Sequence, residues 1–213
     1  MEPCRRERGG GGGKWGRWRD VGIGVCRHRC RGAGAGGAIE TSGHHLTVEG
    51  TASASSERGK AGEWLIDPGD IEVKTRLAGD PLQGNSMADV QKVTDTLNNG
   101  TSVNIQTDNL TGPNDNSITI TDAIRKTSGG DVALRLKATG AININADITA
   151  ETPASAATPT GKLSLEVTSD TNKTAGGSVS MASGTSIKTL GGNVKIGGGL
   201  VDNGVGFANS QSA

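Results

Sequence analysis

The sequence predicts an all-β fold, a right-handed parallel β-helix (a solenoid of short strands) with one short flanking helix. First, residues 129–199 repeat a unit in which a glycine precedes apolar residues at alternate positions. Alternation of period two places those apolar residues on one face of a strand. Second, the units recur at intervals that leave no room for crossover helices. Third, only 2% of the residues are aromatic, which suits a narrow core of stacked aliphatic side chains better than an ordinary globular core.

Five copies of this unit begin at Gly130, Gly140, Gly161, Gly177 and Gly192. Their first inward residues are spaced by 10, 21, 16 and 15 residues along the chain: Val132, Ile142, Leu163, Val179 and Val194. Asn-Gly and Asp-Gly hairpin signals are scarce, which argues against a sandwich or an up-and-down barrel. We therefore expect about four to six stacked rungs, with the right-handed connection that parallel strands prefer.

The chain divides by composition into a basic start and an acidic body. Residues 1–36 hold nine basic and three acidic residues, a net charge of +6, whereas residues 37–213 carry −6. The start is rich in arginine and glycine, holds all three cysteines and lacks apolar periodicity, so we expect disorder. Cys4, Cys26, His28 and Cys30 have poor spacing for a zinc site, and an RNA-binding arm is the other functional alternative. A non-native reading frame ahead of a truncated gene is a further hypothesis for this segment.

Two blocks of residues open the ordered body, which we expect to span residues 37–199. The first reads as one rung, with Ile39, Leu46 and Val48 facing inward around a turn at Ser42–Gly43. The second places Trp64 and Ile66 on one face of a strand and Leu65 on the other, before turn residues at Asp67–Pro68. The residues of the two blocks are Gly37, Ile39, Thr41, Ser42, Gly43, Leu46, Val48 and Gly50, then Gly62, Trp64, Leu65, Ile66, Asp67, Pro68, Asp70 and Ile71.

These two blocks resemble the repeat region of the filamentous haemagglutinin-like adhesins, which Gram-negative bacteria export by two-partner secretion. In that family a G-x-I-x-T-S-G…L-x-V-x-G rung is commonly followed by G-x-W-L-(I/L)-D-P-x-D-I. The resemblance implies a fragment of a surface adhesin acting as a β-helical shaft, located extracellularly or on the bacterial cell surface. It implies host or bacterial cell-surface glycans or proteins as partners, and an outer-membrane transporter for the full-length protein. The shaft of a contact-dependent growth-inhibition toxin is the alternative within this resemblance.

The start of the sequence shows no apolar core of a signal peptide, so export of this chain by itself is not indicated. No apolar run is long enough for a membrane-spanning helix, and the balanced total of 22 basic and 22 acidic residues does not favour nucleic acid. We expect the last residues, 200–213, to be a frayed tail.

One helix is predicted, from about Met87 to Asn98. Ser86 begins a sequence similar to a capping box, Val90, Val93 and Leu97 follow at helical spacing, and Gly100 supplies a stop signal. We expect the apolar stripe of this helix to pack against the β-helix. Ile118, Ile120 and Ile124 predict further strands. Arg125–Lys126 then occupies a place where the family usually has an apolar or aromatic residue, which predicts imperfect packing of that rung.

The sequence lacks the patterns that carry catalysis or metal binding. No Ser/His/Asp set, Cys/His pair or phosphate loop is evident, so we expect no catalytic residues, no cofactor and no metal. Asp70 is interpreted as a solvated or turn-capping carboxylate, not as a catalytic one. His44 and His45 are adjacent and would face opposite ways on a strand, which is poor geometry for a shared metal. A polysaccharide lyase or hydrolase remains the enzymatic alternative, but its clustered carboxylates are absent from the sequence pattern.

Overall fold

The computed structural model describes residues 34–56, 59–77, 86–107, 116–172 and 177–198. These residues form an all-β fold of three parallel sheets with one helix. Each pair of neighbouring strands among them is parallel, as the sequence predicts. Most of the expected disordered start, residues 1–36, and the whole expected frayed tail lie outside the described residues. Residues 34–36 of that start are described, and the Gly36 N–H donates to the Lys60 carbonyl oxygen at 2.8 Å.

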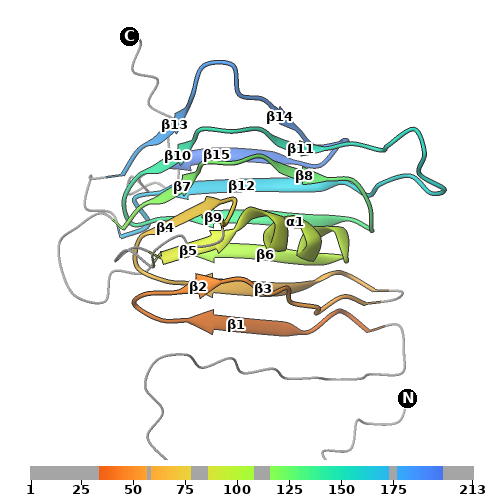
Figure 1. The fold of residues 1–213 in the computed structure, drawn as a ribbon, viewed down its shortest axis with the longest axis horizontal. Helices are drawn as coiled ribbons and strands as arrows, with labels where there is room; N and C mark the ends of the chain where they lie inside the picture. Colours follow the sequence, from red (N-terminus) through yellow and green to blue (C-terminus); the bar gives the residue numbers. More distant parts are fainter. Residues whose placement is uncertain (1–33, 57–58, 78–85, 108–115, 173–176, 199–213) are drawn as a thin grey trace, which may run out of the picture.

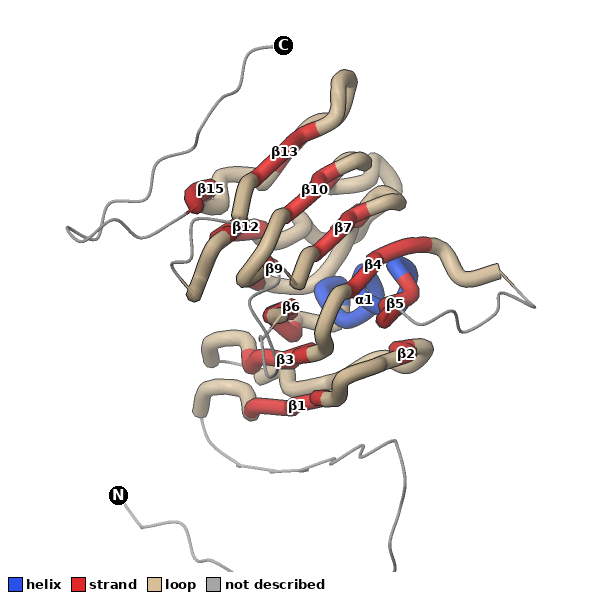
Figure 2. The backbone as a smooth tube through the Cα atoms, turned by 90° about the vertical axis from the view of Figure 1, so that its left-hand side faces the viewer, coloured by secondary structure: helices blue, strands red, loops and turns tan. Residues whose placement is uncertain are grey.

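The first sheet has six strands stacked in chain order, from one end of the molecule to the other (Figure 2). They are β1 (Ala38–Ser42), β3 (Gly62–Asp67), β6 (Thr101–Gln106), β9 (Val132–Lys137), β12 (Leu163–Ser169) and β15 (Val194–Gly198). Inward positions stay in register: Trp64 lies opposite Val103, which lies opposite Leu134, which lies opposite Leu165.

The second and third sheets hold the strands between these. The second sheet runs in the spatial order β13 (Val179–Met181), β10 (Ile142–Ile144), β7 (Ile118–Ile120), β4 (Ile71–Lys74), β5 (Ser86–Asp89) and β2 (Thr47–Val48). The third runs β14 (Ile187–Lys188), β11 (Ile148–Ala150) and β8 (Ile124–Lys126). From β9 onward the chain passes through the first, second and third sheets in turn and then returns to the first.

The repeated glycine units of the sequence therefore belong to different sheets. Val132 pairs in register with Leu163 in the first sheet, while Ile142 pairs with Val179 in the second. Between β9 and β12 the interval that separates stacked neighbours is 31 residues, from Leu134 to Leu165. One turn of the chain thus contains strands from more than one copy of the unit, which is why successive copies are unevenly spaced.

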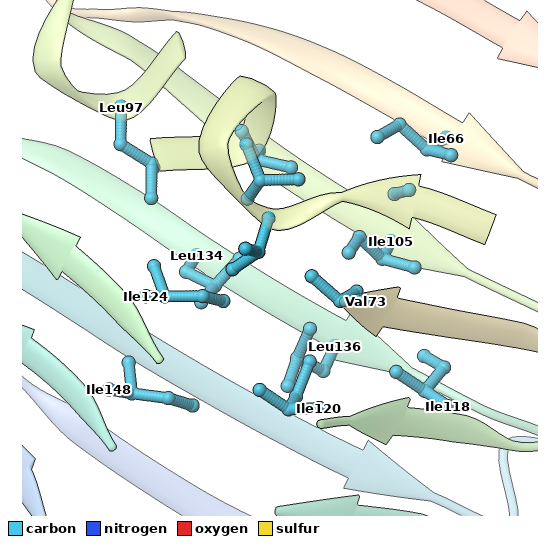
Figure 3. Close-up of a cluster of buried hydrophobic side chains, with 14 of the residues drawn as sticks. Ile66, Val73, Leu97, Ile105, Ile118, Ile120, Ile124, Leu134, Leu136 and Ile148 are labelled. Carbon is cyan, nitrogen blue, oxygen red and sulfur yellow. The ribbon is translucent and has the colours of Figure 1, made fainter. Parts of the chain in front are cut away.

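The core lies between the sheets and consists mainly of isoleucine, leucine and valine (Figure 3). Ile66, Ile105, Leu136, Ile120 and Ile148 are all fully buried. Burial alternates along the strands, as in β9 and β12, because every second side chain points outward. Removing this aliphatic surface from water is the main stabilising contribution available to a fold with so few aromatic residues.

The helix α1 spans Val90–Asn98 and begins three residues later than the sequence predicts. The expected first residues form β5 instead, because the N–H groups of Ser86 and Met87 donate to the carbonyl oxygens of Asp70 and Leu46 in neighbouring segments. Asp89 caps the helix by accepting a hydrogen bond from the Gln91 N–H at 3.0 Å. The apolar stripe packs against β6 and β8, so the predicted role of that stripe is confirmed.

Candidate functional site

The two sequence blocks lie side by side at the end of the molecule that holds β1. Ile39 is opposite Trp64 and Thr41 is opposite Ile66, so the motif residues of β1 stack on those of β3. Trp64 is 4% exposed and its Nε1–H donates to the Thr41 hydroxyl at 3.0 Å. Val48 and Ile71 are also buried, while Leu65 is half-buried on the outer face. The alternation predicted for Trp64, Leu65 and Ile66 is confirmed.

The glycines of these blocks differ in what surrounds them. A Cβ added at Gly62 would overlap the carbonyl oxygens of Ala54 and Gly37, whereas one added at Gly37 would meet nothing within 4 Å. Gly62 is therefore required by close backbone packing, and Gly37 is not. At Gly43 a Cβ would meet the end of the Leu46 side chain at 2.9 Å.

Aspartates in the turns bond to the backbone of neighbouring segments. Asp70 accepts from the Ser117 N–H at 2.6 Å, which agrees with its interpretation as a capping residue. Asp122 accepts from the Thr75 N–H at 2.6 Å and Asp131 from the Lys162 N–H at 2.8 Å. We call Asp70, Asp122, Asp131 and Asp147 the turn aspartates. Charge-assisted bonds of this kind fix one turn against the next.

Asp147 shows the electrostatic effect of this arrangement. Its Oδ1 accepts from the Ser186 N–H at 2.8 Å and from the Ser186 hydroxyl at 3.0 Å. These hydrogen bonds stabilise the ionised form and hold the pKa of Asp147 below its ordinary value, with a smaller contribution from Arg125. The Asp70 and Asp67 carbonyls also accept backbone N–H groups, from Ser86 and Gly43.

A row of charged side chains crosses the outer face of the first sheet. Arg135 of β9 pairs with Glu63 of β3 and, at 3.5 Å, with Glu166 of β12. Glu166 also lies 3.7 Å from the Lys195 ammonium on β15. Asn104 donates to Glu63 at 3.2 Å. We call Glu63, Asn104, Arg135, Glu166 and Lys195 the charged row. Partly exposed ion pairs link four of its strands, and the hydrogen bond from Asn104 adds β6 as the fifth.

The sequence interpretation missed the charged row because the carboxylates are far apart along the chain. Strand pairing aligns Glu166 of β12 with Arg135 of β9, and Glu63 reaches the same arginine diagonally from β3. The available signal was weak: Arg135 and Glu166 each follow the first glycine of their unit by five residues. Lys195 breaks that spacing, following Gly192 by three.

Lys126 belongs to the Arg125–Lys126 pair that departs from the family pattern, and its charged side chain is buried. It is fully buried, and its Nζ donates to the carbonyl oxygens of Ser128 and, at 3.2 Å, Gly129. Burial disfavours the ammonium and lowers the pKa of Lys126 to about 8, partly offset by Asp131. Ile124 remains fully buried beside it, so the rung accommodates the lysine through these bonds.

The two histidines lie in a bend, not in a strand as the sequence analysis assumed. Their ring centroids are 4.4 Å apart with an interplanar angle of 53°, so the rings are in contact and do not face opposite ways. Within the described ranges, no group of three His, Cys, Asp or Glu side chains is placed to hold a metal ion.

The comparisons with known proteins leave the family undecided. No family model matches the chain. No curated protein matches it either.

The helix of the structure is too short and too polar to cross a membrane, and the described residues contain no other candidate span. In chemical terms, the charged row and the turn aspartates offer ion pairing and hydrogen bonding on an extended polar surface.

Proposed function

We propose that the described residues form a right-handed parallel β-helical shaft and that the chain is a fragment of a filamentous haemagglutinin-like bacterial surface adhesin. In this role the shaft displays the outer face of the first sheet, whose strands are the longest, to other cells. The location is extracellular or on the bacterial surface. The partners are glycans or proteins of host or bacterial cells, and an outer-membrane transporter serves the full-length protein.

One observation carries the proposal: from β6 onward successive strands occupy the three sheets in rotation, and the paired strands are all parallel. The run β9, β10, β11, β12 takes the first, second, third and first sheets, and β12, β13, β14, β15 repeats it. A chain that returns to the same sheet about one rung higher each time is the arrangement of a stacked coil. The juxtaposed motif blocks around Trp64 add support from the sequence resemblance.

Adhesion is tested by coating beads with the purified full chain and measuring their attachment to epithelial cells and to bacterial cells. We expect saturable attachment that free chain competes away. Glycosidase or protease treatment of the cells identifies which class of partner is bound. Beads that attach no better than albumin-coated beads would contradict an adhesive role.

A matched pair of variants locates the displayed face. Arg135→Gln with Glu166→Gln removes the ion pair between these residues and their pairs with Glu63 and Lys195 in the charged row. Lys74→Gln with Glu72→Gln removes a pair at 2.9 Å from the second sheet. Both leave the net charge unchanged. We expect only the first double variant to weaken attachment. Cleavage of acidic polysaccharides by the wild-type chain would instead support the enzymatic alternative.

A further inference from the structure

The two ends of the first sheet carry strands with one free edge. Among the described residues, β1 pairs only with β3 and β15 pairs only with β12. Figure 2 shows these two strands at opposite ends of the stack. Because every strand of the sheet runs in the same direction, the free edge of β15 presents the polarity that a parallel β1 would complete.

Inward-facing apolar residues are incompletely covered at both ends. Val194 of β15 is 47% exposed, while its in-register neighbour Leu165 is 1% exposed. Met181 of β13 is 44% exposed, while its in-register neighbour Ile144 is fully buried. At the other end, Ile39 of β1 is only partly buried. The stacking that buries the core elsewhere is therefore incomplete at these positions.

The two end strands also carry side chains of opposite charge, Lys195 on β15 and Glu40 on β1. The described residues 177–198 contain Lys188 and Lys195 and no acidic residue, while residues 34–56 contain Glu40 and Glu49 and no lysine or arginine. Two like ends would repel each other, and two unlike ends attract. Glu49 lies outside β1 and is paired with Arg76, whereas Glu40 lies on β1 and accepts a hydrogen bond from the Ser42 hydroxyl.

We propose that copies of this chain associate end to end, with β15 of one copy pairing in parallel with β1 of the next. The register that continues the alternation places Val194 on Ile39 and Lys195 opposite Glu40. That contact covers the exposed apolar edge and extends the charged row into the second copy. The contact joins two different surfaces, so each added copy leaves one unpaired end on the assembly, which can then grow beyond a dimer. The inference needs only the parallel first sheet and holds independently of the adhesive role.

The test measures the mass distribution of the full chain by sedimentation velocity over a range of concentrations and salt. We expect species larger than dimers whose proportion rises with concentration and falls with salt, because the attracting charges are exposed. A monodisperse monomer at every concentration would overturn the proposal. So would a population that stops at the dimer.

Charge exchange tests the register. Lys195→Glu and Glu40→Lys should each weaken association by roughly tenfold, since an attracting pair becomes a repelling one. The two substitutions in one chain should restore it. Association that is indifferent to all three variants would overturn end-to-end docking through these strands. Thermal unfolding of each variant confirms that it is folded.

The apolar edge is tested separately with Val194→Lys and the matched control Val194→Thr. The lysine adds a positive charge to the positive end, which electrostatics alone would make favourable toward Glu40. The edge contact predicts the reverse, because the added ammonium would be buried against Ile39 of the next copy. We expect association to be lost with lysine and kept with threonine. Unchanged association of Val194→Lys would overturn the contact.

Discussion

Some glycines lie where two turns of the chain approach each other closely, and others do not. Gly62 and Gly37, near Trp64, are a matched pair of these two kinds. We expect Gly62→Ala to lower the free energy of unfolding by about 1–3 kcal/mol, because its Cβ would overlap the carbonyl oxygens of Ala54 and Gly37. Gly37→Ala should be neutral or stabilising by up to about 1 kcal/mol, because that Cβ meets open space. Urea unfolding of both variants measures the difference, and equal midpoints would contradict it.

Lys126 predicts a specific dependence of stability on pH. Its folded pKa of about 8 lies below the ordinary value of 10.5. Between these values the unfolded chain binds more protons than the folded one, so the contribution of this residue to stability rises as pH increases from 8 to 10.5. Below that window the cost of burying the ammonium is fully present, on the order of 3 kcal/mol as an upper figure.

The variant Lys126→Met isolates this effect. Methionine has a similar length and does not titrate, so the wild-type chain should gain stability relative to the variant as pH rises through the window. Chemical unfolding of both proteins at a series of pH values measures the difference. A constant difference across the window would show that Lys126 is not buried as an ammonium.

At the scale of elements, strand positions follow from the sequence better than strand partners do. Alternation after Gly130 and Gly161 locates β9 and β12, because a strand buries every second side chain. It does not show that these two strands pair, since the segment between them visits two other sheets. The charged row was unpredictable for the same reason: Glu63 and Arg135 are 72 residues apart.

At the start of α1, residues that the sequence predicts to be helical form strand β5 instead, because they pair with neighbouring strands. Ser86 has the residue type of a cap, but its hydroxyl accepts from the Leu46 N–H at 3.0 Å and its backbone joins the second sheet. Asp89, three residues after Ser86 in the segment that resembles a capping box, is the residue that caps the helix. N-cap preferences identify Ser86 and Asp89 as residues able to cap a helix. Because Ser86 pairs in the second sheet, Asp89 is the one that caps α1.

The cap assignment predicts that Asp89→Ala lowers the free energy of unfolding by about 1 kcal/mol, because the Gln91 N–H loses its acceptor. Asp89→Asn keeps a side-chain oxygen in the same place and serves as the matched control, with an expected change of a few tenths of a kcal/mol. Thermal unfolding followed by circular dichroism compares the two. A larger loss with asparagine than with alanine would contradict the cap.

At the scale of the whole molecule, each strand of the first sheet pairs within that sheet only with its neighbours in the stack, so stability should be unequal along it. Strands β6 and β9 have a paired strand on each side and fully buried inward residues such as Ile105 and Leu134. Strands β1 and β15 have a neighbour on one side only among the described residues. Opening an end of the stack exposes less apolar surface than opening its middle.

Hydrogen–deuterium exchange at low protein concentration should therefore show graded protection, highest for amides of β6 and β9 and lowest for those of β1 and β15. Dilution matters, because end-to-end association would pair the free edges and raise protection there. We expect protection of β15 to increase with concentration in the wild-type chain and to stay low in Val194→Lys, while β9 is unaffected in both. Uniform protection across the six strands would mean that the sheet opens as one cooperative unit and that its ends are no weaker than its centre.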